Sequence, residues 1–130
     1  MSIQPITPTD VHPPGGAYSH GVSARGQGRT LYISGQVGLR ADGILAGDFA
    51  EQAAQSWRNI VAILSADGMN VHHLVKLTTY LTNISFAREL GRVREPFLEG
   101  ARPASTLIAV QALVMPDWLI EIEAIAFKND

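Results

Sequence analysis

Two glutamates near the end of the chain are the side chains best suited to chemistry. Glu121 and Glu123 interrupt an apolar run over Ile120–Phe127 whose alternation is typical of a β-strand. Because strand side chains alternate between faces, both carboxylates lie on one side of the predicted sheet, together with Ile125. A carboxylate on a half-buried strand faces water, meets a cationic or hydrogen-bonding partner, or moves protons. Glu121 is therefore our candidate catalytic group, with a structural contact between subunits as the alternative.

Other common catalytic patterns are missing from the sequence. The four histidines, His12, His20, His72 and His73, show no H-E-x-x-H spacing, and the chain has no cysteine to complete a zinc set. No G-x-S-x-G serine motif and no phosphate-binding G-K-S or G-K-T loop occurs. We therefore expect no metal and no cofactor, and the sequence argues against a nucleophilic hydrolase.

Composition narrows the class of protein further. The chain has 130 residues, 46% of them hydrophobic, which predicts a single folded domain over residues 1–130. No run of about 18 apolar residues occurs, and the first 14 residues lack the basic start and apolar stretch typical of a signal peptide. We therefore expect a cytoplasmic protein without a membrane partner. A net charge of −2 without a dense Lys/Arg block argues against nucleic acid as a partner.

The first third of the chain is predicted to be rich in β-structure. Residues 1–16 contain four prolines and should form an extended lead-in. Strands are expected over residues 18–23 and 30–34, joined as a hairpin by the glycine-rich segment between them. Asp42-Gly43 predicts a second turn, which folds the chain back before the first helix.

Two helices are predicted after this region. Asp48 and Glu51 fit a capping box at the start of the first helix, and Gly68 favours its end. A strand over residues 75–82 follows, and Ser85 is the expected cap of the second helix.

The last strands complete an α+β layer. Strands over residues 106–113 and 118–127 are expected to form an antiparallel pair. The order of elements places both helices on one face of the sheet and leaves the other face, which carries Glu121 and Glu123, uncovered. Because that face is partly apolar, we expect it to be covered by self-association.

Several separate segments resemble one known family. Gly16-Ala17-Tyr18-Ser19 resembles the family's Gly-Pro-Tyr-Ser element, and Leu31–Gln36 resembles its Ser-Gly-Gln strand. Arg102-Pro103-Ala104 and Ile120–Ala126 resemble its C-terminal signature. By their order and spacing, the chain is similar to the reactive-intermediate deaminase family, the Rid or YjgF-type proteins also described as endoribonuclease L-PSP-like.

The resemblance implies a fold and an activity. It implies a chorismate-mutase-like α+β fold, with a mixed sheet and two helices on one face, assembled as a homotrimer with small-molecule clefts between subunits. Deaminating members hydrolyse enamines and imines such as 2-aminoacrylate to a keto acid and ammonia without a cofactor. An arginine holds the substrate carboxylate and a glutamate on the last strand positions or activates water. By position, Tyr18, Ser34, Gly35 and Glu121 match cleft residues.

One position departs from the family pattern. Where the deaminating members continue Arg-Pro-Ala-Arg, this chain has Ser105 after Arg102-Pro103-Ala104, and a serine lacks both the charge and the two-pronged geometry that a carboxylate prefers. Ser105 and Arg102 are nevertheless taken as substrate-binding positions, and Arg102 or Arg94 is a possible replacement for the cation. Three functions stay open: an enamine or imine deaminase, a non-catalytic small-molecule-binding or chaperone-like trimer, and an endoribonuclease.

Overall fold

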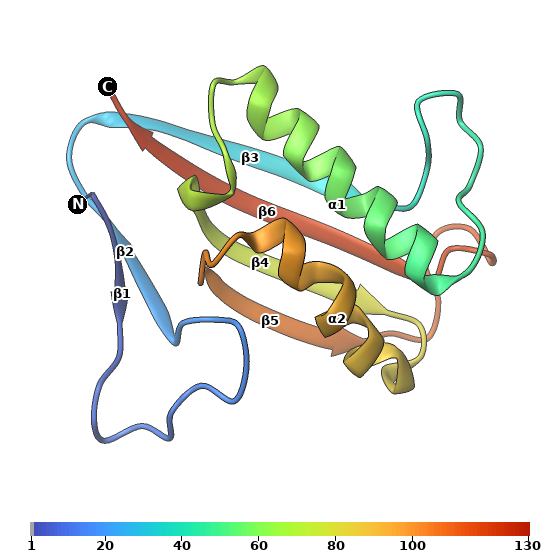
Figure 1. Cartoon of the computed structure of the whole chain (residues 1–130), viewed down its shortest axis with the longest axis horizontal. Helices are drawn as coiled ribbons and strands as arrows, with labels where there is room; N and C mark the ends of the chain where they lie inside the picture. The colour runs from blue at the N-terminus through green and yellow to red at the C-terminus, as the bar shows by residue number, and fades with distance from the viewer. Residues whose placement is uncertain (1) are drawn as a thin grey trace.

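One mixed sheet, covered on one face by helices, makes up most of the molecule (Figure 1). The computed structural model describes residues 2–130. The main sheet has the strand order β3 (Gly28–Gln36), β6 (Ile120–Asn129), β4 (Leu74–Leu81) and β5 (Ala104–Ala109). The covering helices are α1 (Phe49–Ala66) and α2 (Ala87–Leu98), and the 3₁₀ turns η1 (Val71–His73) and η2 (Ile84–Phe86) flank β4. This confirms the predicted α+β arrangement of two helices on a mixed sheet.

The last strand lies in the middle of the sheet rather than beside the strand before it. β6 pairs antiparallel with both β3 and β4, whereas β5 pairs with β4 in parallel. The predicted antiparallel pair over residues 106–113 and 118–127 is therefore wrong. Since α2 carries the chain back across the sheet after β4, β5 enters at the same end as β4 and runs parallel to it.

The N-terminal region forms a small sheet of its own. β1 (Ile3–Ile6), inside the segment predicted as an extended lead-in, pairs antiparallel with β2 (Gly21–Ala24). The predicted hairpin over residues 18–34 is wrong, because β2 uses its edge for β1 while β3 pairs with β6. The glycine-rich segment still turns the chain, and Gly26, with φ of +89°, takes a conformation that favours glycine. It redirects the backbone from one sheet into the other.

Helix α1 begins and ends as the sequence predicts. Asp48 Oδ1 accepts a hydrogen bond from Glu51 N at 3.0 Å. The return bond is made one residue earlier than in a capping box, since Glu51 Oε2 accepts from Gly47 N at 2.9 Å. After the helix, Gly68 has φ of +69°, as a glycine terminator requires.

The start of α2 differs from the prediction. Asn83 Oδ1 accepts a hydrogen bond from Ser85 N at 3.0 Å, so Asn83 caps the preceding turn η2. Ser85 is thus a donor inside that turn, and α2 begins at Ala87 without a side-chain cap among the residues described. Pro96 is accommodated in the last turn of α2. The side chain that fixes this turn is therefore Asn83, two residues upstream of the predicted cap.

The core lies between the two helices and one face of the sheet. Its fully buried members include Trp57, Ile60, Leu64, Leu77, Leu81, Leu90, Leu98, Ile120 and Ile122. The opposite face of the sheet stays open, and Tyr32 there is 75% exposed. In the described residues, no helix is long and apolar enough to cross a membrane.

Candidate functional site

A bulge in β3 positions the carboxylate of Glu121. The β3–β6 register pairs Ile33 with Ala124 and then Gln36 with Ile122, so β3 carries an extra residue at Ser34-Gly35. A Cβ atom at Gly35 would collide with Glu121 Oε2 and would stand 2.7 Å from its Cδ. The Glu121 side chain therefore lies against the β3 backbone, in space that exists because residue 35 has no side chain.

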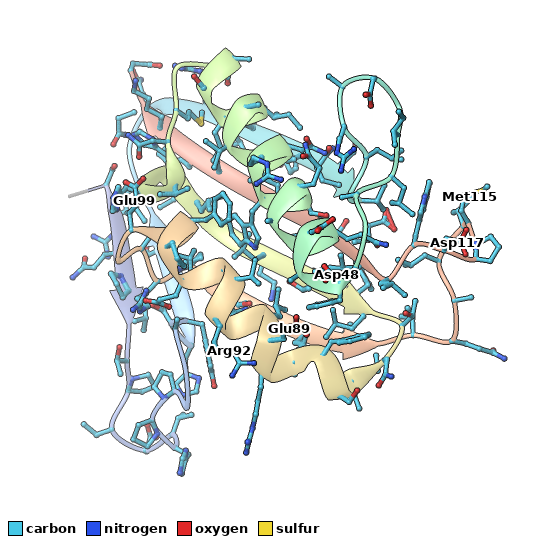
Figure 2. The ribbon with its side chains drawn as sticks, turned by 45° about the vertical axis from the view of Figure 1, so that its right-hand side comes forward. Asp48, Glu89, Arg92, Glu99, Met115 and Asp117 are labelled. Atoms are coloured by element: carbon cyan, nitrogen blue, oxygen red, sulfur yellow. The ribbon has the colours of Figure 1, made fainter. Side chains whose placement is uncertain are left out.

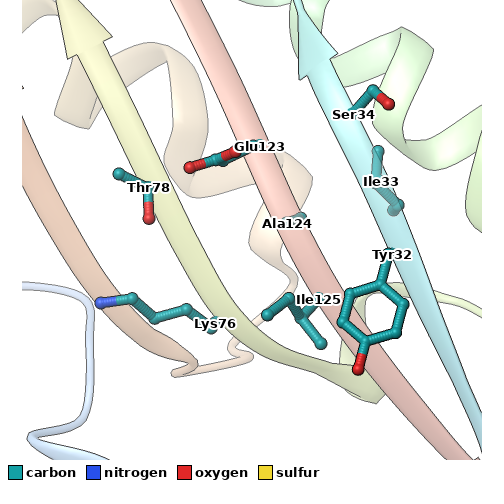
Figure 3. A pocket seen from close by; sticks show the side chains of 8 residues that line it. All are labelled: Tyr32, Ile33, Ser34, Lys76, Thr78, Glu123, Ala124 and Ile125. Carbon is teal, nitrogen blue, oxygen red and sulfur yellow. The ribbon is translucent and has the colours of Figure 1, made fainter.

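On the face that also carries this carboxylate, the sheet is hollowed over β3, β6 and β4, and the acid that lines the hollow is Glu123. The hollow has a volume of about 300 Å³ and is lined by Tyr32, Ser34, Lys76, Thr78, Glu123 and Ile125, among others. Figure 3 shows Glu123 extending from β6 toward Thr78 on β4, with Tyr32 and Ile125 nearer the other end. Lys76 lies at the same end as Ile125, so polar and apolar groups both line the hollow, and its volume suits a small metabolite.

Hydrogen bonds fix the polar part of the open face. The Tyr80 hydroxyl donates to Glu123 Oε1 at 2.7 Å, and Lys76 Nζ donates to Thr106 Oγ1 at 2.6 Å. The pKa of Tyr80 is raised, first by its hydrogen bond to Glu123 and then by partial desolvation and the negative charges of Glu123 and Glu121. These bonds hold Lys76, Tyr80 and Glu123 in defined positions around the hollow.

The other predicted site residues lie around the start of β5. Ser19 Oγ donates to Arg102 O at 2.5 Å and Ser19 N donates to Pro103 O at 3.1 Å, which ties the segment containing Tyr18 to this strand. The Tyr18 hydroxyl accepts from Gly15 N at 3.3 Å. Ser105 pairs with the buried Leu77 in the parallel register, so its side chain belongs to the helix-covered side of the sheet.

Arg102 is already engaged by an acid. Its guanidinium donates to Glu95 Oε1 at 2.9 Å and to Ala101 O at 2.9 Å. Arg102 also lines a second hollow of about 280 Å³, which includes Ile3, Val22 and His72, away from the hollow that contains Ser34. This arrangement does not direct the Arg102 charge toward Glu121.

The structure therefore separates the predicted site residues into two groups within one chain. Ser34, Gly35 and Glu121 come together across β3 and β6, whereas Tyr18, Arg102 and Ser105 gather at the start of β5, with β4 between that strand and β6. Their functional roles stay predictions.

Three polar residues of the open face were not singled out from the sequence. Lys76, Thr78 and Tyr80 share a face of β4, and the register pairs Thr78 with Glu123 and Tyr80 with Glu121. The alternation of the β4 sequence places all three on the face opposite its buried leucines. That signal was present, but it identifies the site only once β4 is known to lie beside β6.

The adjacent histidines His72 and His73 serve the turn before β4. His73 Nδ1 accepts a hydrogen bond from Asn70 N at 3.0 Å, and burial lowers the pKa of His73, with a further contribution from the charge of Lys128. Across residues 2–130, no group of three His, Asp or Glu side chains lies close enough together to hold a metal ion. His73 thus helps to cap η1.

Known proteins are similar to this chain in both sequence and fold. The profile of a family described as endoribonuclease L-PSP matches residues 9–128. A RutC family protein of Pyrococcus horikoshii is 35% identical over 118 residues, which cover 89% of this chain and 90% of the relative. A rat protein named 2-iminobutanoate/2-iminopropanoate deaminase is 35% identical over 116 residues, covering 88% of this chain and 82% of the relative.

A solved structure gives the same result for the fold. A protein of the Rid family from Yersinia pestis, described as being of unknown function, superimposes with a TM-score of 0.87 and 39% sequence identity. The match covers 97% of this chain and 98% of the other. The similarity therefore extends over the N-terminal sheet, both helices and the four-stranded sheet.

Proposed function

Because this chain belongs to the endoribonuclease L-PSP family, which brings it together with RutC and Rid proteins, we propose that it hydrolyses small enamine or imine intermediates. The products would be a keto acid and ammonia. The observation that carries the proposal is the Glu121 carboxylate, which lies against Gly35, while the preceding Ser34 lines a small hollow in the same sheet. The rat relative named as an imine deaminase supports the same class of reaction.

The chemistry needs a proton acceptor and a way to hold water. In imine hydrolysis, the water oxygen bonds to the imine carbon while a base takes a proton from the water. The nitrogen takes up this proton to give a carbinolamine. The hydroxyl proton of the carbinolamine then moves to the nitrogen as the carbon–nitrogen bond breaks, which gives a carbonyl group and ammonia. Glu121 would accept the first proton and return it to nitrogen, and the Ser34 hydroxyl would hold water or substrate.

A homotrimer with clefts between subunits is part of this proposal. The Glu121 group and the Tyr18 group lie apart in one chain, so a neighbouring copy would have to bring them together. The open sheet face and the β5 edge, where Leu107 is 38% and Ile108 41% exposed, are available to such a copy. Covering these surfaces would also shield the hollow from water.

The alternative is a small-molecule-binding or chaperone-like trimer without catalysis. Ser105 favours it, because a hydroxyl cannot replace the charged fork of an arginine. Ser105→Arg distinguishes the two. If the wild type releases no ammonia and this variant does, the cleft is intact and lacked only the arginine. A net charge of −2 gives little support to an endoribonuclease, because RNA is negatively charged and is bound through basic side chains.

The decisive measurement is ammonia release from freshly generated 2-imino acids. We expect Glu121→Gln to reduce the rate by about 10²-fold or more, the usual contribution of a general base. Glu89→Gln on α2 makes the same chemical change away from the hollow and should leave the rate unchanged. Equal rates for the wild type and Glu121→Gln would remove Glu121 as the catalytic group.

A further inference from the structure

The hollow on the open face of the sheet has an ammonium group and a carboxylate on its walls. Lys76 and Glu123 both line it, together with Thr78. Thr78 is two residues from Lys76 on the same face of β4, and it is the register partner of Glu123 on β6. Figure 3 shows the Glu123 side chain directed toward Thr78. The hollow therefore presents one group of each charge, with the threonine between them.

Neither charged group is neutralised by the other or by a different side chain. Across residues 2–130, no Asp or Glu oxygen lies within 4.0 Å of Lys76 Nζ, and no Lys, Arg or His nitrogen lies within 4.0 Å of the Glu123 carboxylate. Lys76 Nζ uses one of its three donors on Thr106 Oγ1, and one Glu123 oxygen accepts from the Tyr80 hydroxyl. Two donors on Lys76 and the second oxygen of Glu123 remain for a ligand.

The two opposite charges disfavour a ligand that carries a single charge. An anion is attracted by Lys76 but repelled by Glu123, and a cation experiences the reverse. A molecule with both charges satisfies both side chains, and their separation of more than 4.0 Å leaves space for a group between them. An α-amino acid carries a carboxylate and an ammonium group on one carbon atom, so it matches this pair of charges.

Apolar side chains beside the charged groups offer a surface for the rest of the ligand. Tyr32 on β3 pairs with Ile125 on β6, and both line the hollow (Figure 3). Tyr32 is 75% exposed, so a ligand that covered its ring would remove apolar area from water. The volume of about 300 Å³ favours a small ligand. These features select an amino acid with a short aliphatic side chain.

We propose that this hollow binds a small aliphatic α-amino acid through both of its charged groups. In this arrangement, Lys76 contacts the carboxylate and Glu123 contacts the ammonium group. The aliphatic side chain lies against Ile125 and Tyr32. The inference goes beyond the proposed function, because it concerns Glu123 rather than Glu121 and requires no reaction.

Binding of L-valine to the intact protein, measured by calorimetry, tests the proposal. Two analogues each lack one of its charged groups: isobutylamine has no carboxylate, and isovalerate has no ammonium group. We expect saturable binding of L-valine and dissociation constants at least about tenfold weaker for both analogues, since each loses a hydrogen-bonded charge. No saturable binding of L-valine, or equal affinity for the three compounds, would overturn the proposal.

Substitutions of the two charged side chains test the assigned contacts. Glu123→Gln should weaken L-valine binding at least about tenfold but not isovalerate binding, because the anion loses a repulsive neighbour. Lys76→Met should weaken L-valine binding to a similar degree but not isobutylamine binding. Wild-type affinity for L-valine in either variant would contradict the contacts. Should one variant fail to fold in urea titrations, the other decides.

Matched controls for both substitutions lie on the helix-covered side of the sheet. Glu89→Gln changes an acid on α2 (Figure 2), and Lys128→Met changes a lysine of β6 whose Nζ donates to Gly68 O at 2.8 Å. Both variants should bind L-valine as the wild type does. A loss of binding in these controls equal to that in Glu123→Gln and Lys76→Met would contradict a site in the hollow.

Glu121→Gln separates this inference from the proposed function. Glu121 does not line the hollow, so this variant should retain L-valine binding even where ammonia release is lost. Binding of L-valine without ammonia release by the wild type would support the amino-acid site and contradict the deaminase. Ammonia release that depends on Glu121, without L-valine binding, would support the deaminase and contradict the amino-acid site.

Discussion

Neighbouring residues of β6 have different surroundings, because their side chains lie on opposite faces of the sheet. On the helix-covered face, Ile120 and Ile122 are 0% exposed and belong to the core. On the open face, Glu121 and Ile125 are only half-buried and Glu123 is exposed. One set of side chains therefore stabilises the fold, while the alternating set remains free for binding and chemistry. Substitutions on the two faces should consequently have different kinds of effect.

The largest effect is expected in the core. Ile122→Ala should lower the free energy of unfolding by about 2–5 kcal/mol, since it leaves a cavity among well-packed side chains. Ile125→Ala removes the same atoms from the half-buried face and should lower it by less than about 1.5 kcal/mol. Urea unfolding at low protein concentration measures both values, and equal losses would contradict the distinction between the faces.

Protein concentration sharpens this comparison. If copies of the chain cover the open face, the loss caused by Ile125→Ala should grow as the protein concentration rises, because assembly stabilises the folded state by mass action. The loss caused by Ile122→Ala should change much less, since that side chain is buried within one chain. A concentration-independent effect at Ile125 would count against a second copy on this face.

A smaller effect on stability, but a clear one on function, is expected where β3 meets Glu121. Gly35→Ala puts a methyl group where the Glu121 carboxylate lies. Because the obstructing atoms belong to a flexible side chain, Glu121 should move away, at about 1 kcal/mol or less. Imine hydrolysis should then fall severalfold, which ammonia release would measure.

Gly91→Ala is the matched control for this substitution. Among the described residues, nothing lies within 4 Å of a Cβ atom at Gly91, and alanine favours a helix over glycine by about 1 kcal/mol. Gly91→Ala should therefore be neutral or slightly stabilising and should retain activity. Full activity in Gly35→Ala would show that the position of Glu121 over the bulge is unimportant.

The face of each strand could be predicted from the sequence, but its neighbours could not. The alternation in β6 and β4 gave the correct buried side chains because strand geometry is local. The parallel pairing of β5 with β4, and the insertion of β6 between β3 and β4, depend on contacts far apart in the chain. The wrong hairpin had the same cause, since the glycine-rich turn is compatible with either pairing partner for β2.

Only part of the candidate site could be predicted from the sequence, for the same reason. Ser34, Gly35 and Glu121 were predicted, and the bulge explains why a glycine belongs at position 35. Tyr80 was overlooked because its partner Glu123 is 43 residues away in sequence and becomes a neighbour only through the β4–β6 register. The partial burial of Arg94 also depends on how α2 packs. In the sequence, acidic residues alternate with the arginines of this helix, a pattern that suggests a solvated surface instead.

The smallest expected effect concerns the hydrogen bond that crosses the open face from β4 to β6. The raised pKa of Tyr80 predicts that this phenol ionises above its ordinary value of 10.0, as seen by ultraviolet absorbance after subtracting the titration of Tyr80→Phe. Glu123→Gln removes the carboxylate that raises the pKa, so the ionisation should move to lower pH. An unchanged midpoint in Glu123→Gln would contradict the hydrogen bond.

The raised pKa of Tyr80 also predicts that the protein loses stability at alkaline pH. Since the folded-state pKa of Tyr80 lies above the unfolded value, the bond contributes its full stabilisation below about pH 10 and loses it as the pH rises through the folded-state pKa. Wild type should therefore lose stability relative to Tyr80→Phe in that alkaline window and not at neutral pH. Substitutions on the buried face of β6 should not change this dependence of stability on pH, because the apolar side chains there do not titrate. The pH profile therefore distinguishes the open face from the buried face.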